Sequence, residues 1–373
     1  MKINDFKVEM WMNEYETWAQ CNLSETCVES LTVSELLEIT NSSQSAIKDI
    51  MEMKLTYGAI EGSARLRTAI AGLYSSISPD CVSVMHGAIG ANALTLTGLI
   101  ERGDHVVTVV PTYQQHYSIP ESIGAVVSLC TLKEELNWLP DLAELRKLAV
   151  KGTKVICINN PNNPTGSLMP DEMLKEIVKI ARDCSAWLLC DEAYRGLNHE
   201  GDSFGISIAD IYEKGISTGT MSKPFSLAGL RVGWVAAPKE IIDMLAHLRD
   251  YHVISVGMID DYLSAIALEN KDKILERSLK MCKDNLELLD AWVKGEEHIH
   301  YTRPKAATVT LLHYDFDMPS EVLCRKLQED VGVMLLPGSC FDMENCIRIG
   351  FANNKGDLER GLALFSKWIK ENV

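Results

Sequence analysis

Short apolar runs alternate with amphipathic stretches along the first two thirds of the chain. Each run has the length of a strand and is rich in Val, Ile and Leu. The expected strands are 81–87, 105–111, 125–132, 154–161, 186–193, 216–222 and 231–237. Residues 91–101, 142–150 and 170–184 have helical periodicity. This alternation predicts an α/β fold with a mostly parallel seven-stranded sheet flanked by helices on both faces.

The last third of the chain has a different pattern. Helical stretches are expected at 257–297, 319–331 and 356–372, and apolar runs lie at 307–316, 331–338 and 346–351. This order predicts a smaller α+β domain. We expect the N-terminal forty residues to be helical and to pack with it. The predicted division is a large domain over residues 40–270 and a small domain formed by residues 1–39 and 271–373.

Composition excludes several classes of partner. The net charge of −16 over 373 residues opposes binding to nucleic acid or to an anionic membrane. The 11 cysteines form no CxxC pair and no Cys/His cluster at zinc-finger spacing, so we expect no metal. The N-terminus has no apolar core of signal-peptide length, and no run approaches the length of a membrane span. A cytoplasmic location is therefore expected.

Polar loops follow three of the predicted strands. They have the sequences HGAIGAN (86–92), NNPNNPTG (159–166) and DEAYRG (191–196). Asp191 comes directly after the apolar run AWLLC, which places it at the carboxyl end of a strand. Because ligands of open α/β sheets bind at the carboxyl ends of the strands, these loops are expected to form the site.

Two further segments carry isolated basic residues. GTMSKPFSLAGLRVGW (219–234) holds Lys223 and Arg231, and Pro224 prevents a regular continuation. Taken alone, Lys223 is most simply interpreted as a solvated surface charge. Arg348 lies between apolar neighbours in CIRIGF, and a buried charge needs compensation. Arg348 therefore indicates an anion, which is either a ligand or a structural salt-bridge partner.

The series YG, GA, PTY, NNPTG, DEAY, SK, GLR and RIG, in this order, resembles the class I and II aminotransferases. These are fold-type I pyridoxal phosphate enzymes. The resemblance extends from YGAIEGSARLR near residue 57 to CIRIG near residue 348. One such motif would be weak, whereas the series is specific. It implies pyridoxal 5′-phosphate as cofactor and exchange of an amino group between an L-amino acid and a 2-oxo acid.

The resemblance also implies roles for individual residues. Lys223 matches the lysine that forms the Schiff base and then moves a proton at the substrate's α-carbon. Asp191 matches the carboxylate that pairs with the pyridine nitrogen and keeps it protonated. Tyr194 and Asn163 match groups that hydrogen-bond the phenolic oxygen of the cofactor. Tyr113 has the position of an aromatic side chain that stacks on the ring.

The remaining matches concern the phosphate and the substrate. The implied phosphate ligands are the amides of Gly87, Ala88 and Ile89 and the side chains of Thr220, Ser222 and Arg231. Tyr57 resembles a tyrosine that reaches the phosphate from the neighbouring subunit, which implies a homodimer with shared active sites. Arg348 resembles the arginine that binds the substrate's α-carboxylate, and Asn163 is expected to bind the substrate as well.

Alternatives to transamination remain at this stage. The same residues support a β- or γ-lyase similar to cystathionine β-lyase, or an amino-acid cyclase resembling capreomycidine synthase. A binding protein that keeps the fold without catalysis would be expected to lack Lys223, Asp191 or Arg231, and all three are present.

The N-terminal aromatic residues have two interpretations. Trp11, Tyr15 and Trp18 have spacings that suit the apolar face of a helix, which is the favoured interpretation. The alternative places one of them over the substrate pocket. No residue is recognisable as a clamp for a second substrate carboxylate. His86 and His116 lie beside predicted site residues, but the sequence assigns them no role.

Overall fold

The computed structural model describes residues 2–373, and its largest sheet contains all seven predicted strands. They are β2 (Val82–His86), β3 (His105–Val110), β4 (Val126–Thr131), β5 (Thr153–Asn159), β6 (Trp187–Asp191), β7 (Gly215–Thr220) and β8 (Val232–Ala236). Their order in the sheet is β2-β8-β7-β6-β5-β3-β4. β8 is antiparallel to both of its neighbours, and the β7–β6, β6–β5, β5–β3 and β3–β4 pairs are parallel. The prediction of a mostly parallel sheet is confirmed.

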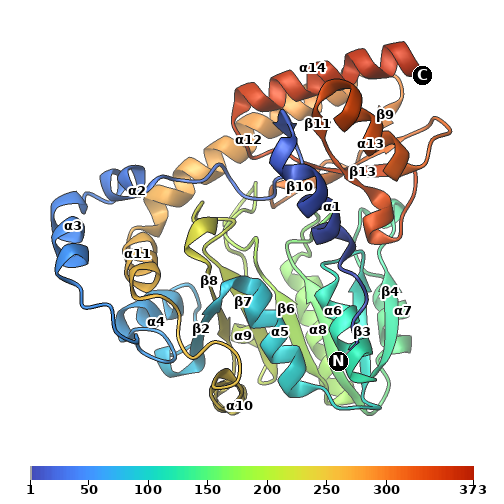
Figure 1. The fold of residues 1–373 in the computed structure, drawn as a ribbon. Coiled ribbons are helices and arrows are strands. Elements are labelled where there is room, and N and C mark those ends of the chain that lie inside the picture. Colours follow the sequence, from blue (N-terminus) through green and yellow to red (C-terminus); the bar gives the residue numbers. More distant parts are fainter. Residues whose placement is uncertain (1) are drawn as a thin grey trace.

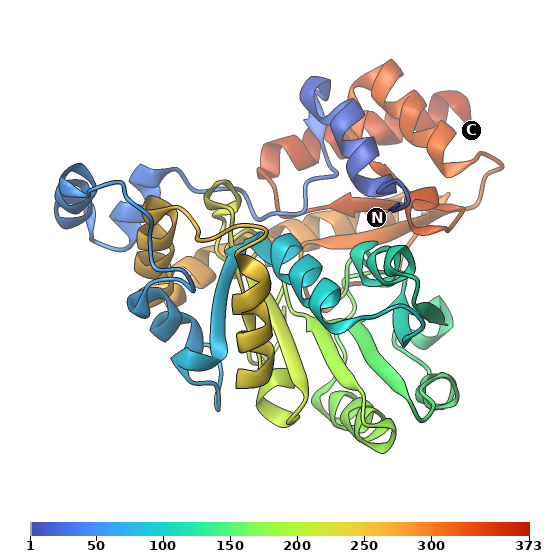
Figure 2. The same cartoon turned by 60° about the horizontal axis from the view of Figure 1, so that its bottom comes forward.

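Helices cover both faces of this sheet, as Figures 1 and 2 show. Along β5, Val155 and Cys157 join one buried cluster, whereas Ile156 and Ile158 join another on the opposite face. The first cluster includes residues of α5 (Gly87–Leu99), α6 (Gln115–Ile123) and α10 (Lys239–Arg249). The second includes residues of α7 (Leu142–Leu148), α8 (Asp171–Cys184) and α9 (Ile208–Ile211). Burial on both faces explains why the strands are apolar at nearly every position.

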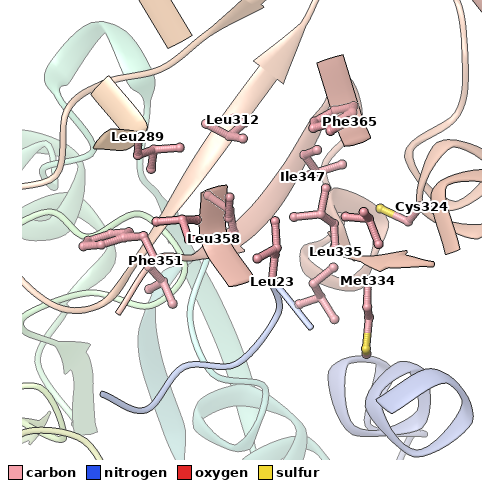
Figure 3. Packing of buried hydrophobic residues seen from close by; sticks show 14 of the residues in the cluster. Leu23, Leu289, Leu312, Cys324, Met334, Leu335, Ile347, Phe351, Leu358 and Phe365 are labelled. Atoms are coloured by element: carbon pink, nitrogen blue, oxygen red, sulfur yellow. The ribbon is translucent and has the colours of Figure 1, made fainter. Parts of the chain in front are cut away.

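The C-terminal part forms a second, antiparallel sheet with its own helices. Its strands, in spatial order, are β12 (Leu336–Pro337), β13 (Cys346–Gly350), β10 (Val309–Tyr314) and β9 (Ile299–His300). Its helices are α12 (Lys271–Gly295), α13 (Ser320–Val331) and α14 (Lys355–Asn372). Figure 3 shows side chains from these elements packing together, among them Leu312, Ile347 and Phe365. Among residues 2–373, no helix combines the length and apolar character needed to cross a bilayer.

The N-terminal segment is helical only in part. It contains α1 (Lys7–Tyr15), a 3₁₀ turn at Glu16–Trp18 and α2 (Val33–Ile39), and α3 (Ser43–Glu52) follows it. Between residues 19 and 32 the chain is extended or irregular. Here β1 (Cys21–Asn22) pairs with β11 (Val333–Met334), and Leu23 bonds to the backbone of Met334 and Gly350. The expectation of a helical N-terminus is wrong for this stretch because pairing with distant strands determines its conformation.

Gly350 shows how closely the N-terminal segment approaches β13. A Cβ atom built at this glycine would lie only 1.8 Å from the carbonyl oxygen of Glu25. The absence of a side chain therefore lets residues 23–25 run directly against the strand that carries Arg348. This contact brings the N-terminal segment to the site described below.

The predicted division into domains stays a prediction. Leu36 and Leu37 of α2 pack with residues of α4 (Ala64–Ala71) and α11 (Met258–Glu269), on the side of the large sheet. α12 contributes to that cluster through Ile274 and Leu275, and to the C-terminal cluster through Leu286. The buried clusters thus cross both predicted boundaries.

Candidate active site

A cavity of about 320 Å³ lies where the carboxyl ends of β5, β6 and β7 approach α1 and β13. Its size is typical of sites for small molecules. The structure brings together nearly all of the predicted site residues. The cavity is lined by Gly87, Ala88, Ile89, Tyr113, Asn163, Asp191, Tyr194, Thr220, Ser222, Lys223, Arg231 and Arg348. Tyr57 is the exception: it is 77% exposed and does not line the cavity.

Asp191 is buried at the end of β6, where hydrogen-bond donors stabilise its carboxylate. The side-chain amide of Asn92 donates to Oδ2 at 2.7 Å, and the backbone N–H of Ala193 donates to Oδ1 at 3.0 Å. The hydroxyl of Thr218 donates to Oδ1 of Asn92 at 2.7 Å, which orients that amide. A carboxylate held in this way is suited to pair with a ligand cation.

His116 lies beside the same carboxylate. Its side chain is fully buried, and Nε2 is 3.6 Å from Oδ2 of Asp191. Nδ1 is 3.2 Å from the hydroxyl of Thr112. This position directs the imidazole toward Asp191 rather than toward the open cavity. By contrast, His86 is exposed.

Lys223 contacts two residues of the N-terminal segment. Nζ donates to the hydroxyl of Thr26 at 2.5 Å and to Sγ of Cys27 at 3.3 Å. Burial by itself disfavours the ammonium form. Cys27, Tyr194 and Glu25 outweigh this effect, so the pKa of Lys223 is raised above its ordinary value. Contacts with Thr26 and Cys27 therefore hold the Lys223 side chain in the cavity, and it is not a solvated surface charge.

Arg348 is a buried cation on β13 with only 2% of its surface exposed. Its Nη1 donates to Oδ1 of Asn163 at 3.0 Å, and its Nη2 donates to the carbonyl of Ser24 at 3.1 Å. Nε has no hydrogen-bond partner, and within residues 2–373 no carboxylate lies at salt-bridge distance. Burial lowers the pKa of Arg348. An anionic ligand would supply the missing compensation, whereas a structural salt bridge is not formed.

The first turn of α5 forms a candidate anion site. The amides of residues 87–89 lie at the helix N-terminus, which carries partial positive charge and here lacks a side-chain cap. A Cβ atom built at Gly87 would lie 3.2 Å from Nη2 of Arg231, so this guanidinium borders the same turn. Gly233 lets β8 approach closely, because a Cβ there would lie 2.5 Å from the amide nitrogen of Ala88. Backbone donors and an arginine thus meet at one point.

Thr220 and Ser222 also border this part of the cavity. Their hydroxyls lie 3.0 Å apart, with Thr220 donating to Ser222. Tyr113, on the other side, donates its hydroxyl to Oε1 of Glu9 at 2.6 Å. Tyr194 is buried and lines the cavity between Lys223 and Arg348.

Several residues of the site were missed by the sequence analysis. Asn92 ends the quoted motif HGAIGAN and lies one helical turn from its first residues, a spacing that was available as a signal. Thr26 and Cys27 contact a lysine 197 and 196 residues away, and no local pattern indicates this. Glu9 lies on a helix whose aromatic periodicity does not indicate which of its faces meets the cavity.

Those aromatic residues mostly serve the core. Trp11 and Tyr15 are buried in the C-terminal cluster, and the indole N–H of Trp11 donates to the carbonyl of Leu335. Trp18 is half exposed and does not line the cavity. The favoured interpretation is therefore confirmed for Trp11 and Tyr15, but not for Trp18.

Comparison with known families agrees with this arrangement. The family model of aminotransferase class I and II matches residues 28–364. The protein belongs to this family. The match includes β2 through β13, and with them every predicted site residue.

The relatives of this chain are named for different reactions. The structure is similar to that of a PLP-dependent aminotransferase from Streptococcus suis 89-1591, with TM-score 0.96 and 40% identity over 100% of this chain and 99% of that one. Capreomycidine synthase from Streptomyces vinaceus is 27% identical over 96% of this chain and 92% of its own. An aspartate aminotransferase from Pyrococcus horikoshii is 29% identical over 85% of this chain and 84% of its own.

Class I and II aminotransferases depend on pyridoxal 5′-phosphate, and the cavity residues fit this cofactor. The helix N-terminus with Arg231 provides donors for a phosphate. Asp191 provides a buried carboxylate for the pyridine nitrogen, and Lys223 provides an amine for the aldehyde. One cavity thus contains groups that suit the phosphate, the pyridine nitrogen and the aldehyde of pyridoxal phosphate.

The contact between Asn92 and Asp191 generates a prediction. Replacing Asn92 with leucine removes a donor to the buried carboxylate and leaves the hydroxyl of Thr218 unpaired. We expect the dissociation constant for pyridoxal phosphate to rise by roughly tenfold or more. Fluorescence titration of cofactor-free protein with the cofactor measures it.

Thr95 on the same helix offers a matched control. It is buried, and its hydroxyl has no partner in the described part of the chain, so Thr95→Val removes no bond. Equal cofactor affinity in the two variants would contradict the role assigned to Asn92.

Proposed function

We propose that this protein is an aminotransferase that moves an amino group between an L-amino acid and a 2-oxo acid. The observation that carries this proposal is the convergence of Lys223, Asp191 and Arg348 on one cavity. The 40% identity to a protein named as a PLP-dependent aminotransferase supports the same reaction.

Each of these residues has a role that its surroundings favour. Bound pyridoxal phosphate would supply an electron sink that stabilises negative charge on the substrate's α-carbon. Lys223 would hold the cofactor covalently until the substrate's amino group takes its place, and its freed, neutral Nζ would then take the proton from that carbon. Asp191 would pair with the pyridine nitrogen and keep a proton on it, since Asn92 and Ala193 hold its carboxylate in place. Tyr194 and Asn163 would donate hydrogen bonds to the cofactor's phenolic oxygen.

Arg348 would bind the substrate's α-carboxylate. Its guanidinium is fixed by Asn163 and by the carbonyl of Ser24, so little rotational freedom is lost when a carboxylate binds. This fixed position would orient the bond from the α-carbon to its hydrogen relative to the acceptor amine of Lys223.

Cyclisation is a second candidate reaction. It is favoured by the similarity to capreomycidine synthase, which extends over 96% of this chain. The roles proposed for Lys223, Asp191 and Arg348 are common to both reactions, because both begin with removal of the α-proton. The two differ in whether the amino group is transferred to an acceptor.

A spectroscopic titration of the cofactor-loaded protein with amino acids, in the absence of any oxo acid, tests the function. We expect the absorption of the lysine-bound cofactor to be replaced by that of its amino form, with one equivalent of 2-oxo acid released. The Lys223→Ala variant should show no such change, and borohydride reduction should no longer link cofactor to its peptide in a mass spectrum.

Two other results would contradict transamination. Continuous release of ammonia with oxo acid, while the original absorption persists, would indicate a lyase. A product with the same number of nitrogen atoms as the substrate, or one changed only by loss of water, would indicate a cyclase.

Replacement of Arg348 tests the assigned carboxylate site. We expect Arg348→Ala to raise KM for amino acids on the order of 100-fold, because a buried charged interaction is lost. The variant should still bind the cofactor, which its absorption spectrum reports. Arg360→Ala, on the exposed face of α14, is the control. An unchanged KM in Arg348→Ala would make this arginine structural.

We also propose that the protein forms a homodimer through the region around α3. Ile47, Met51, Leu55 and Tyr57 are 57%, 80%, 74% and 77% exposed, which is unusual for apolar side chains in one short segment. A second copy covering this segment would bury them. It would also carry Tyr57 toward the partner's phosphate site, as the family resemblance implies.

Sedimentation analysis of the cofactor-loaded protein tests this assembly. We expect a dimer, and we expect Met51→Asp combined with Leu55→Asp to produce monomers. Val322→Asp, at an exposed apolar position on α13, serves as the control and should leave the dimer intact. A wild-type monomer at micromolar concentration would exclude the shared site.

A further inference from the structure

The helix α1 presents two different faces to its surroundings. Val8, Trp11 and Tyr15 are buried in the C-terminal cluster. The other face lines the active-site cavity with Glu9, Met12, Asn13 and, one residue beyond the helix end, Glu16. The positions 9, 12, 13 and 16 follow the helical repeat, so they form one continuous wall. Figures 1 and 2 show α1 beside the C-terminal elements, above the strand ends of the large sheet.

Two carboxylates on this wall have no cation to pair with. Within residues 2–373, neither Glu9 nor Glu16 forms a salt bridge, and Glu9 only accepts a hydrogen bond from the hydroxyl of Tyr113. Burial raises the pKa of Glu16, and the nearby carboxylates of Glu25 and Glu9 raise it further. Glu25 differs from the other two because it accepts backbone hydrogen bonds from Thr26 and Cys27.

The cations of the cavity are already committed under the proposed function. Lys223 and Arg231 would serve the cofactor, and Arg348 would bind the α-carboxylate of the substrate. Arg348 independently indicates a ligand, since it is 98% buried with an unpartnered Nε and lines the same cavity. No cation of the cavity is left to pair with Glu9 and Glu16. These two carboxylates are therefore available to bind a second positive group of the same ligand.

We infer that α1 forms a subsite for the cationic side chain of a basic L-amino acid. Glu9 and Glu16 would bind its terminal ammonium or guanidinium group, and the side-chain oxygen of Asn13 would accept a further hydrogen bond. Met12 would contact the methylene carbons of the side chain, together with Val8, which lies where the two faces of α1 meet and also lines the cavity. This inference rests on the proposed function, because it assumes that Arg348 binds the α-carboxylate and that the α-carbon lies within reach of Lys223.

The same wall disfavours acidic substrates. A side-chain carboxylate would meet Glu9 and Glu16, and like charges at close range in a partly buried site repel. The sequence also contains no recognisable clamp for a second carboxylate. A donor such as aspartate, named for the relative from Pyrococcus horikoshii, is therefore not expected here.

The test compares substrates of similar shape and different charge. The cofactor-loaded protein is mixed with L-lysine, L-ornithine or L-arginine, and separately with L-norleucine, L-norvaline or L-glutamate. The change in cofactor absorption gives the rate of the first half-reaction. We expect L-lysine to exceed L-norleucine in kcat/KM by about tenfold or more, and L-glutamate to be the poorest substrate.

Variants then locate the effect on α1. Glu16→Gln should reduce the ratio of kcat/KM for lysine over norleucine by about fivefold, since Glu16 lies at the exposed rim. Glu9→Gln keeps an acceptor for Tyr113 and should reduce the ratio by roughly tenfold, since Glu9 is less exposed. Glu14→Gln lies on the same helix outside the cavity and should leave the ratio unchanged.

Binding provides a readout that does not depend on turnover. 2-Methylornithine lacks the α-hydrogen, so calorimetry with the loaded protein measures its affinity directly. The dissociation constant of 2-methylornithine should rise about tenfold in Glu9→Gln and about fivefold in Glu16→Gln. The dissociation constant of 2-methylnorvaline, which has no cationic group on its side chain, should stay unchanged in both variants.

The possible failures are distinguishable. If amino acids react but norleucine or glutamate equals lysine, the subsite is overturned and the proposed function stands. If the ratio falls equally in Glu14→Gln, the effect is not specific to the cavity wall, which also overturns the subsite. If no amino acid changes the cofactor absorption, both proposals fall.

Discussion

Burying the carboxylate of Asp191 at the end of β6 constrains much of the surrounding structure. A buried anion without donors would cost several kcal/mol, so donors must come from neighbouring elements. Asn92 supplies one from α5, and Thr218 of β7 fixes the orientation of Asn92. α5 also carries the amides of its first turn, which form the candidate phosphate site. One chain of hydrogen bonds thereby sets the spacing between the two ends of the proposed cofactor site.

The cavity combines opposite charges that the protein does not neutralise itself. Arg348 is a buried cation without a carboxylate partner, whereas Glu9 and Glu16 are carboxylates without a cation within the residues described. Ion pairs formed within the protein would reduce the free-energy cost of burying these charges. Keeping these charges apart lowers the stability of the empty protein and raises its complementarity to a ligand with the inverse pattern.

Much of the fold could be predicted from the sequence because it depends on local patterns. The apolar strands of the large sheet are buried on both faces, and such runs are recognisable one at a time. Asp191 and Lys223 could be placed in the site because short motifs surround them. Thr26 and Cys27 could not, because their proximity to Lys223 arises from strand pairing near Leu23 and Gly350. Glu9 could not be placed in the site for a similar reason. The periodicity of α1 shows that the helix has two faces, but it does not show which face packs on the core and which lines the cavity.

The route of the N-terminal segment has a consequence for how this protein can evolve. The residues proposed to hold the cofactor belong to the large sheet and its loops, whereas Glu9, Asn13, Glu16, Thr26 and Cys27 all lie within the first thirty residues. That segment is anchored to β11 and β13 by backbone hydrogen bonds, which tolerate many side chains. Thr26 and Cys27 contact the proposed catalytic lysine, whereas Glu9, Asn13 and Glu16 do not. Mutations at these three positions of α1 can therefore exchange one substrate preference for another while the residues proposed for the chemistry stay the same. The cavity-facing side of α1 can thus change independently of the loops of the large sheet.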